Sequence, residues 1–118
     1  MASDCIFCRI VQGKSPSTVV YQDELVMAFR DIHPRAPKHI LLIPKEHVNS
    51  LNDLVLEEKA ALVGHLFQVA ARVAKAEGVA ESGYRMVVNC GPNAGQVVPH
   101  LHFHLLGGRW LGTFCGRG

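Results

Sequence analysis

The segment from Pro99 to Gly108 alternates histidine with apolar residues, and this alternation restricts its local conformation strongly. Successive side chains of a β-strand point to opposite faces of the sheet, so an extended run separates the two kinds of residue. One face then carries His100, His102 and His104, and the other carries Leu101, Phe103 and Leu105. We therefore predict a strand whose apolar face packs into a core and whose histidine face carries chemistry.

Three imidazoles on one strand face are consistent with more than one kind of site. Imidazole titrates near neutral pH and can act as a nucleophile, a proton carrier or a metal ligand. Imidazoles spaced along a strand can also converge on one metal ion. The triplet by itself leaves catalysis, metal binding and ordinary surface or core histidines open.

The composition is that of a globular protein with a single core. A chain of 118 residues, 48% of them hydrophobic, can bury roughly two thirds of its unfolded surface, so we expect one domain over residues 1–118. A formal net charge of +2 gives no reason to expect nucleic acid or a membrane surface as a partner. The chain lacks an apolar run of the ~20 residues that span a bilayer, and its first residues do not resemble a secretory signal. We therefore expect a cytoplasmic protein.

The four cysteines divide into one close pair and two isolated residues. In a reducing cytoplasm the spacing Cys5-Ile-Phe-Cys8 indicates a metal or redox site rather than a structural disulfide. A thioredoxin-like redox pair follows a strand and opens a helix, whereas no strand is predicted before Cys5, so the position favours a metal. We interpret Cys90 and Cys115 as core filler or free thiols.

Hydrophobic periodicity and turn residues predict a mixture of helices and short strands. Helices are expected over residues 4–12, capped by Asp4, and over 57–77, and strands over 19–21, 25–29, 39–43, 84–90 and the histidine run. The strand over 39–43 is apolar on both faces, which places it in the middle of its sheet. Short connections favour antiparallel pairing. We therefore expect an α+β fold with a five-stranded antiparallel sheet, one long helix and a short N-terminal helix.

The long helix has an apolar stripe that can pack on the sheet. The stripe consists of Leu62, Leu66, Val69 and Val73, with Val63, Phe67, Ala70 and Ala74 beside it. His65 falls on the opposite arc, and we interpret it as an exposed helix residue rather than a ligand. The arc is wide enough to contact a partner subunit as well, although it suits the core of a monomer equally.

The run His100-Leu-His102-Phe-His104-Leu-Leu resembles the signature of the histidine triad (HIT) superfamily. Further segments are similar to its Hint-like branch, namely Asp31-Ile32-His33-Pro34, His39, Gly95-Gln96 and Gly107-Gly108-Arg109. The similarity extends over nearly the whole chain, from Cys5 to Arg109.

The resemblance implies a nucleotide hydrolase that cleaves purine nucleoside 5′-phosphoramidates through a covalent nucleotidyl-histidine intermediate. It implies that His102 is the nucleophile and that His104 contacts the phosphate oxygens. His39 would orient the triad, and His100 would help to position the nucleophile. A neutral imidazole held in one tautomer by a hydrogen bond is a competent nucleophile near pH 7, which agrees with this assignment.

The resemblance also implies a set of nucleotide-binding residues. Asp31 would hold the ribose hydroxyls, and Asn89 with the backbone of Gly95 and Gln96 would meet the phosphate. Val97, next in the chain, belongs to the same nucleotide-binding set. The side chains expected to enclose the base are Ile6, Phe7, Ile10, Phe29 and Ile32. Taken one at a time, these apolar residues would be interpreted as ordinary core.

Some bacterial-type relatives in this branch bind a structural zinc ion that the chemistry does not require. The matching positions here are Cys5, Cys8, His47 and His100, a tetrahedral Cys₂His₂ set. The resemblance also implies a homodimer, with the long helix and residues 84–90 at the interface and the sheet extended across it.

Two departures from the Hint-like pattern bear on activity. Val97 stands where many of these proteins have a serine that can hydrogen-bond near the phosphate, so turnover or leaving-group preference is expected to differ. Residues 110–118 also lack the Trp-Pro-Pro-Gly ending of the branch. The alternatives are a dinucleoside polyphosphate hydrolase, a catalytically weak nucleotide-binding protein, and a metallohydrolase that uses the triad as zinc ligands.

Overall fold

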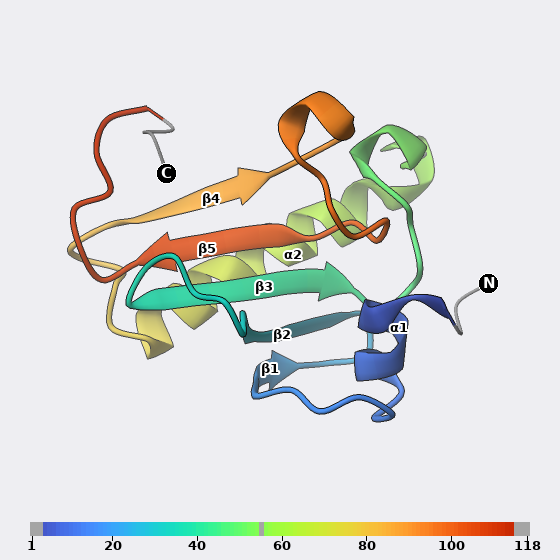
Figure 1. Cartoon of the computed structure of the whole chain (residues 1–118), viewed down its shortest axis with the longest axis horizontal. Helices are drawn as coiled ribbons and strands as arrows, with labels where there is room; N and C mark the ends of the chain where they lie inside the picture. Colours follow the sequence, from blue (N-terminus) through green and yellow to red (C-terminus); the bar gives the residue numbers. More distant parts are fainter. Residues whose placement is uncertain (1–3, 55, 115–118) are drawn as a thin grey trace.

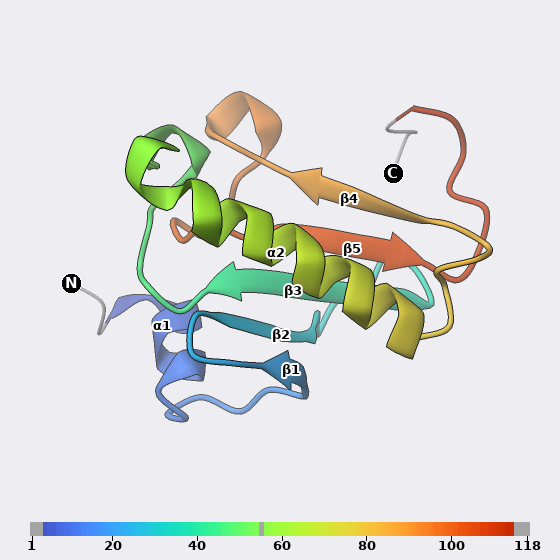
Figure 2. The same ribbon diagram turned by 180° about the vertical axis from the view of Figure 1, so that it is seen from behind.

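The computed structural model describes residues 4–54 and 56–114, and Cys115 lies outside them. A five-stranded antiparallel sheet in the order β1-β2-β3-β5-β4 carries one long helix on one face and a short helix near one end of the other (Figures 1 and 2). The elements are α1 (Ile6–Val11), β1 (Val19–Gln22), β2 (Val26–Arg30), β3 (Lys38–Pro44), α2 (Leu56–Ala76), β4 (Tyr84–Val88) and β5 (Phe103–Gly107), with 3₁₀ turns η2 (Leu51–Asp53) and η3 (Pro92–Ala94). The predicted α+β fold is confirmed.

Strand β3 is the centre of the sheet, as its apolar sequence predicts. It pairs with β2 on one side and with β5 on the other, and all of its residues after Lys38 are buried. Because paired residues share a face, Leu41 and its partner His104 point to the same side of the sheet. His39 lies two residues from Leu41 and therefore faces that side as well.

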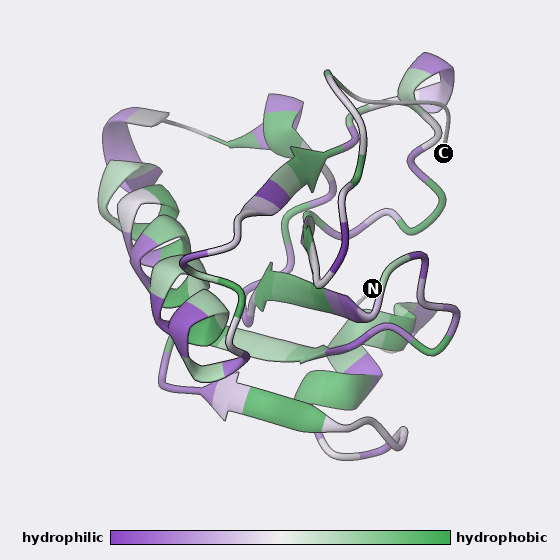
Figure 3. Cartoon of the chain, turned by 90° about the vertical axis from the view of Figure 1, so that its left-hand side faces the viewer, coloured by the Kyte–Doolittle hydropathy of each residue, from purple (hydrophilic) through white to green (hydrophobic). Residues whose placement is uncertain are grey.

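The other face of the sheet forms the larger core with α2. The predicted stripe is confirmed, because Leu62, Leu66, Val69 and Val73 are all buried against β2, β3 and β5. Burying one such side chain contributes about 1.5–3 kcal/mol, so this stripe supplies much of the helix's attachment. Hydrophilic and hydrophobic residues alternate along α2 in Figure 3, as expected for a helix packed on one side.

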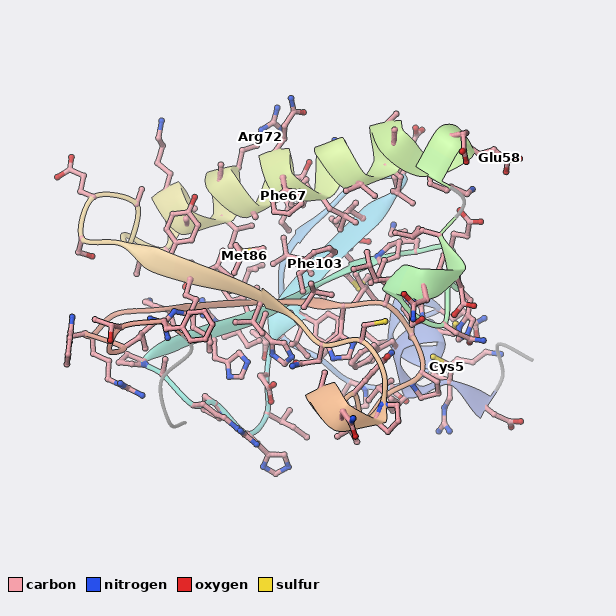
Figure 4. All side chains as sticks on the ribbon, turned by 90° about the horizontal axis from the view of Figure 1, so that it is seen from above. Cys5, Glu58, Phe67, Arg72, Met86 and Phe103 are labelled. Atoms are coloured by element: carbon pink, nitrogen blue, oxygen red, sulfur yellow. The ribbon has the colours of Figure 1, made fainter. Side chains whose placement is uncertain are left out.

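Phe67 lies at the margin of this helix-sheet core. Its side chain is 50% exposed, and its ring packs edge-on against Phe103 of β5 with centroids 5.5 Å apart (Figure 4). The helix thus leaves about half of the Phe67 side chain exposed to solvent. No helix in the described part of the chain combines the length and apolar character needed to cross a membrane.

The histidine strand begins later than the alternation predicts. Strand β5 starts at Phe103, so His100 and His102 precede the sheet. The backbone there pairs elsewhere: the Leu101 N–H donates to the Val48 carbonyl, at 2.6 Å. His100 is therefore held against the segment that follows β3 instead of extending the strand face.

Three smaller expectations are also corrected. The N-cap of α1 is Cys5, whose Sγ accepts the Cys8 N–H at 3.4 Å, rather than Asp4. Strand β4 ends at Val88 instead of residue 90. His65 is half-buried rather than exposed, because its Nε2 lies 2.6 Å from Asp23 Oδ2.

Asp23 connects the β1–β2 turn to α2 through a dense set of hydrogen bonds. Its carboxylate accepts from the Tyr21 hydroxyl, from His65 and from the N–H groups of Leu25 and Val26. Burial acts to raise the pKa of Asp23, but these hydrogen bonds outweigh it and hold the pKa well below its usual value. A carboxyl with a depressed folded-state pKa stabilises the fold above its unfolded pKa, and this stabilisation is lost as the pH falls.

Asp23→Asn should therefore destabilise the protein by about 1–2 kcal/mol at pH 7. The difference from wild type should shrink as the pH falls below about 4, where the unfolded carboxyl takes up a proton. Urea unfolding at pH 7, 5 and 3 measures both effects, with Glu24→Gln as the matched control on the neighbouring exposed carboxylate. A pH-independent difference would contradict the assignment.

Candidate active site

The sheet face opposite α2 carries a cavity of about 930 Å³, on the side turned to the viewer in Figure 1. This volume lies within the range of small-molecule sites, roughly 300–1,000 Å³. Side chains from α1, β2, β3, β4 and β5 line it, together with the loops that follow β2, β4 and β5. His39, His102 and His104 are among them, so the cavity brings together three of the four histidines predicted to act in catalysis.

One wall of the cavity is apolar. The expected base-binding side chains that line it are Phe7, Ile10, Phe29 and Ile32. Phe7 and Phe29 pack edge-on with centroids 5.5 Å apart, and this contact restricts the orientation of both rings in the wall. Ile6, one turn before Ile10 on α1, is 43% exposed and lies outside the lining, so its contact with a base stays a prediction.

A backbone hydrogen bond determines which nitrogen of His102 is free. His102 Nδ1 lies 2.7 Å from the carbonyl oxygen of His100. A carbonyl can only accept, so Nδ1 carries the proton and Nε2 of the neutral ring keeps its lone pair. The Phe7 ring stands edge-on to this imidazole with centroids 5.1 Å apart, which restricts its rotation. His102 thus presents a fixed tautomer with nucleophilic Nε2.

His39 and His104 form a hydrogen-bonded pair in which, unlike in His102, each ring carries its proton on Nε2. The Arg35 N–H donates to His39 Nδ1 at 3.0 Å, so the proton of the neutral His39 ring is on Nε2. Nε2 lies 2.9 Å from His104 Nδ1, which must accept. The one N–H of His104 is then at its Nε2. His104 lines the cavity as a donor beside His102.

Both rings of this pair are neutral at pH 7. Burial, and then the neighbouring His102 and His39, lower the pKa of His104 to about 4. Burial likewise lowers the pKa of His39, against the opposing effect of the Asp31 carboxylate.

Asp31 lies directly beside this pair. Its Oδ2 is 3.3 Å from His39 Nε2, and its Oδ1 accepts the N–H of His33 at 2.8 Å. The carboxylate lines the cavity next to the apolar wall. Its predicted contact with a ribose remains a prediction.

The loop after β4 forms the other end of the cavity. Asn89, Gly95 and Val97 line it, and the Asn89 amide donates to the Ala94 carbonyl at 2.9 Å. Gly95 has φ +78°, a conformation that favours glycine. Val97 is 87% exposed and brings no hydrogen-bond donor to this rim.

Gln96 acts within this loop rather than lining the cavity. Its side chain accepts the Gly91 N–H and donates to the carbonyls of Asn49 and Val98. These contacts hold the loop in place before any ligand arrives. Gln96 is not among the residues that line the cavity, so the contact of its backbone with a phosphate stays a prediction.

The predicted Cys₂His₂ residues come together at the N-terminal end of the molecule, where Figure 4 labels Cys5. The ligand atoms of Cys5, Cys8, His47 and His100 all lie within 4.8 Å of one another. His47 Nδ1 is 3.2 Å from Cys8 Sγ, and His100 Nδ1 is 3.3 Å from Cys5 Sγ. The residues gather from α1, the segment after β3 and the segment before β5.

The outer hydrogen bonds of this cluster leave the inner nitrogens free to bind a metal. His100 Nε2 donates to the Pro44 carbonyl at 2.9 Å, and His47 Nε2 lies 2.7 Å from Asn49 Oδ1. Each Nδ1 therefore keeps its lone pair on the side of the sulfurs, as in metal-ligating histidines. Burial, and then the adjacent Cys5, raise the pKa of the Cys8 thiol to about 11, so two thiolates here require a cation. The donor set fits zinc.

A second group of potential ligands behaves differently. Asp31, His39 and His104 also lie within 4.8 Å of one another. The proton on His39 Nε2 fills the space between them, so this group is a hydrogen-bond chain. The His100 ring nitrogens face Pro44 and the cysteines, away from His102 and His104. In the described chain the three triad histidines therefore do not converge on one metal ion.

Several arginines and apolar residues in the cavity wall were not predicted from the sequence. They are Arg30, Arg35, Arg85, Val87, Leu106, Arg109 and Leu111. Strand alternation could have identified Arg85, because Arg85, Val87 and Asn89 share one side of the β4 segment. The Arg85 guanidinium donates to the carbonyls of Leu111 and Gly112, which places the chain after β5 beside β4.

Comparison with known proteins identifies the family of the chain. The family model described as HIT domain matches residues 12–111. The purine nucleoside phosphoramidase of Escherichia coli K12 is 51% identical over 117 residues, which are 99% of this chain and 98% of that protein. The 14 kDa zinc-binding protein of Zea mays is 52% identical over 111 residues, covering 92% of this chain and 85% of that protein.

Solved structures show the same fold. The HIT family hydrolase from Legionella pneumophila superimposes with a TM-score of 0.91 at 46% identity, covering 95% of this chain and 99% of that one. A histidine triad protein from Clostridium difficile gives 0.90 at 45% identity, with 94% and 96% covered. The expected family is confirmed, and the chain belongs to the HIT domain family.

Proposed function

We propose that the protein hydrolyses the P–N bond of purine nucleoside 5′-phosphoramidates through a nucleotidyl-histidine intermediate. The observation that supports this most directly is the pairing of tautomers in one cavity. His102 offers a lone pair at Nε2, and His104 offers an N–H at Nε2. The phosphoramidase named among the relatives supports the substrate class.

The proposed reaction has two displacement steps. His102 Nε2 attacks the phosphorus, the bond between phosphorus and the amine nitrogen breaks, and the departing amine takes up a proton from solvent. Water then attacks the same phosphorus, the bond to Nε2 breaks, and the attacking water releases one proton to solvent, which replaces the proton that the amine took. The products are the nucleoside monophosphate and the free amine, and the ring returns to its neutral tautomer.

The cavity walls suggest how the nucleotide lies. The purine packs against Phe7 and Phe29, and the ribose reaches Asp31. The phosphate lies between the histidines and the loop of Asn89, with the His104 N–H directed at its oxygens. A preorganised donor in a water-poor site stabilises developing negative charge more than the same donor does in water.

Val97 favours one alternative, a nucleotide-binding protein with weak turnover. A valine at the rim can donate no hydrogen bond to a phosphate or leaving group. The binding wall and the histidines are unaffected by this residue, so binding without efficient chemistry is the outcome that competes with the proposal.

His102→Ala should lower the rate of release of adenosine 5′-monophosphate from adenosine 5′-phosphoramidate by on the order of 10³-fold or more. Nucleotide binding should be retained. A matched control is His65→Ala, which removes a histidine from α2 on the other side of the sheet. Diadenosine polyphosphate, tested in parallel, separates the polyphosphate hydrolase alternative. Equal inactivity of wild type and His102→Ala, with both binding nucleotide, would replace this proposal by the binding-protein alternative.

We also propose that Cys5, Cys8, His47 and His100 hold a structural zinc ion. Four protein ligands close a tetrahedral site and leave no open position for a substrate, so the metal would serve stability. It would join α1 to the segment after β3, which carries His47, and to the segment before β5, which carries His100. The zinc-binding relative in maize supports the assignment.

Purified protein should contain close to one zinc ion per chain, and the Cys5→Ser/Cys8→Ser double variant should contain only traces. Chelation should lower the unfolding temperature of the wild type, because binding energy of the metal is folding energy. Cys90→Ser is the matched control, since that thiol lies outside the cluster. Equal trace zinc in all three proteins would contradict the proposal.

We further propose a homodimer formed through β4 and α2. In the described chain β4 pairs only with β5, so its other edge is available for a second copy. The exposed aromatic rings of Tyr84 and Phe67 flank that edge. Antiparallel pairing of two β4 strands about a twofold axis would extend the sheet and cover them.

Sedimentation equilibrium should give about twice the chain mass of 12.9 kDa at micromolar concentration. Phe67→Glu, which adds a charge on the exposed part of this surface, should shift the equilibrium towards the monomer. The matched control Ile32→Glu places the same charge on an exposed apolar side chain away from β4. A wild-type mass of 12.9 kDa would exclude the dimer.

A further inference from the structure

We propose that Asp31 is a positioning residue for the reaction, acting through His39 to fix the donor nitrogen of His104. The inference rests on the proposed function for its kinetic consequence, since it concerns the same cavity. It assigns to Asp31 a role beyond any direct contact with the nucleotide.

The Asp31 carboxylate is held at both oxygens. Oδ1 accepts the His33 N–H at 2.8 Å, and Oδ2 lies 3.3 Å from His39 Nε2. The backbone N–H of Asp31 also donates to the His39 carbonyl at 3.0 Å. The carboxylate is thus aligned with His39 before any ligand enters.

The single proton of the neutral His39 ring is hydrogen-bonded to His104 and lies close to the Asp31 carboxylate. Nε2 lies 2.9 Å from His104 Nδ1 and 3.3 Å from Asp31 Oδ2. The His39 ring is buried, with only 5% of the residue exposed, so water cannot readily replace a lost partner. A carboxylate at this distance favours a proton on the facing nitrogen and restricts rotation of the ring.

Asp31 also acts on the other nitrogen of His39 through the loop. Its bond to the His33 N–H forms a tight turn at the start of the segment that leads to Arg35. The Arg35 N–H is the group that keeps His39 Nδ1 unprotonated. Asp31 therefore favours the same tautomer from both sides of the ring. That tautomer obliges His104 Nδ1 to accept, which leaves the His104 proton at Nε2.

Asn is an informative substitution because it keeps the size of the side chain and loses one acceptor. An amide has one oxygen where Asp31 has two, so its NH₂ group would face either the His33 N–H or the N–H of His39 Nε2. Asp31→Asn should therefore lower kcat by roughly tenfold to a hundredfold, the range found when a metal-bound imidazole loses the outer partner that orients it. Asp53→Asn, on the distant turn η2, is the matched control.

Two substrates separate this role from direct ribose binding. We would compare adenosine and 2′,3′-dideoxyadenosine 5′-phosphoramidate with wild type and Asp31→Asn. Positioning through His39 predicts the same factor of loss in kcat on both substrates. A loss confined to the substrate with ribose hydroxyls, or confined to KM, would overturn the inference.

Imidazole ¹⁵N NMR without substrate gives a readout independent of activity. Wild type should show a protonated Nε2 on both His39 and His104 and a protonated Nδ1 on His102. Asp31→Asn should shift the His39 and His104 nitrogens, while a native-like amide spectrum shows that the variant is folded. Unchanged His39 and His104 nitrogens would overturn the inference. A wild type that turns over neither substrate would reject the proposed function, and the NMR arm would still decide the role of Asp31.

Discussion

His39, His100 and His102 each have one ring nitrogen bound to a backbone group, and the chemistry of the cavity depends on these bonds. The Arg35 N–H binds His39, the Pro44 carbonyl binds His100, and the His100 carbonyl binds His102. A neutral imidazole carries a single proton, so choosing the partner of one nitrogen chooses the state of the other. The same residue type thereby presents an N–H donor at His104, a free lone pair at His102 and a potential metal ligand at His100 within one small region.

The sheet places these backbone groups where the side chains need them. β3 is buried on both faces, so it can carry a core towards α2 and a functional surface on the other side. It contributes His39 within the strand and the Pro44 carbonyl at its end. The register between β3 and β5 sets His104 opposite Leu41, within reach of His39. Packing and chemistry therefore depend on the same strand pairing.

Periodicity in the sequence predicts the elements well but says little about long-range backbone partners. The stripe on α2 and the central position of residues 39–43 follow from apolar spacing, and both are confirmed. The start of β5 at Phe103 does not follow from apolar spacing, because the Val48 carbonyl that accepts the Leu101 N–H is distant in sequence. Spacing indicated a metal or redox site at Cys5 and Cys8, whereas His47, His100 and part of the cavity wall were identified through family resemblance. Asp31 beside His39 was beyond both, since their contact arises from the fold of the intervening loop.

His100 contributes its side chain to the cysteine cluster and its carbonyl to His102. The carbonyl belongs to the backbone, so every amino acid at this position would supply it. During divergence, a lineage can therefore lose the cysteines and the imidazole at position 100 while the tautomer of His102 is preserved, provided the backbone keeps its course. The proposed metal site and the proposed reacting site can evolve separately although they share a residue.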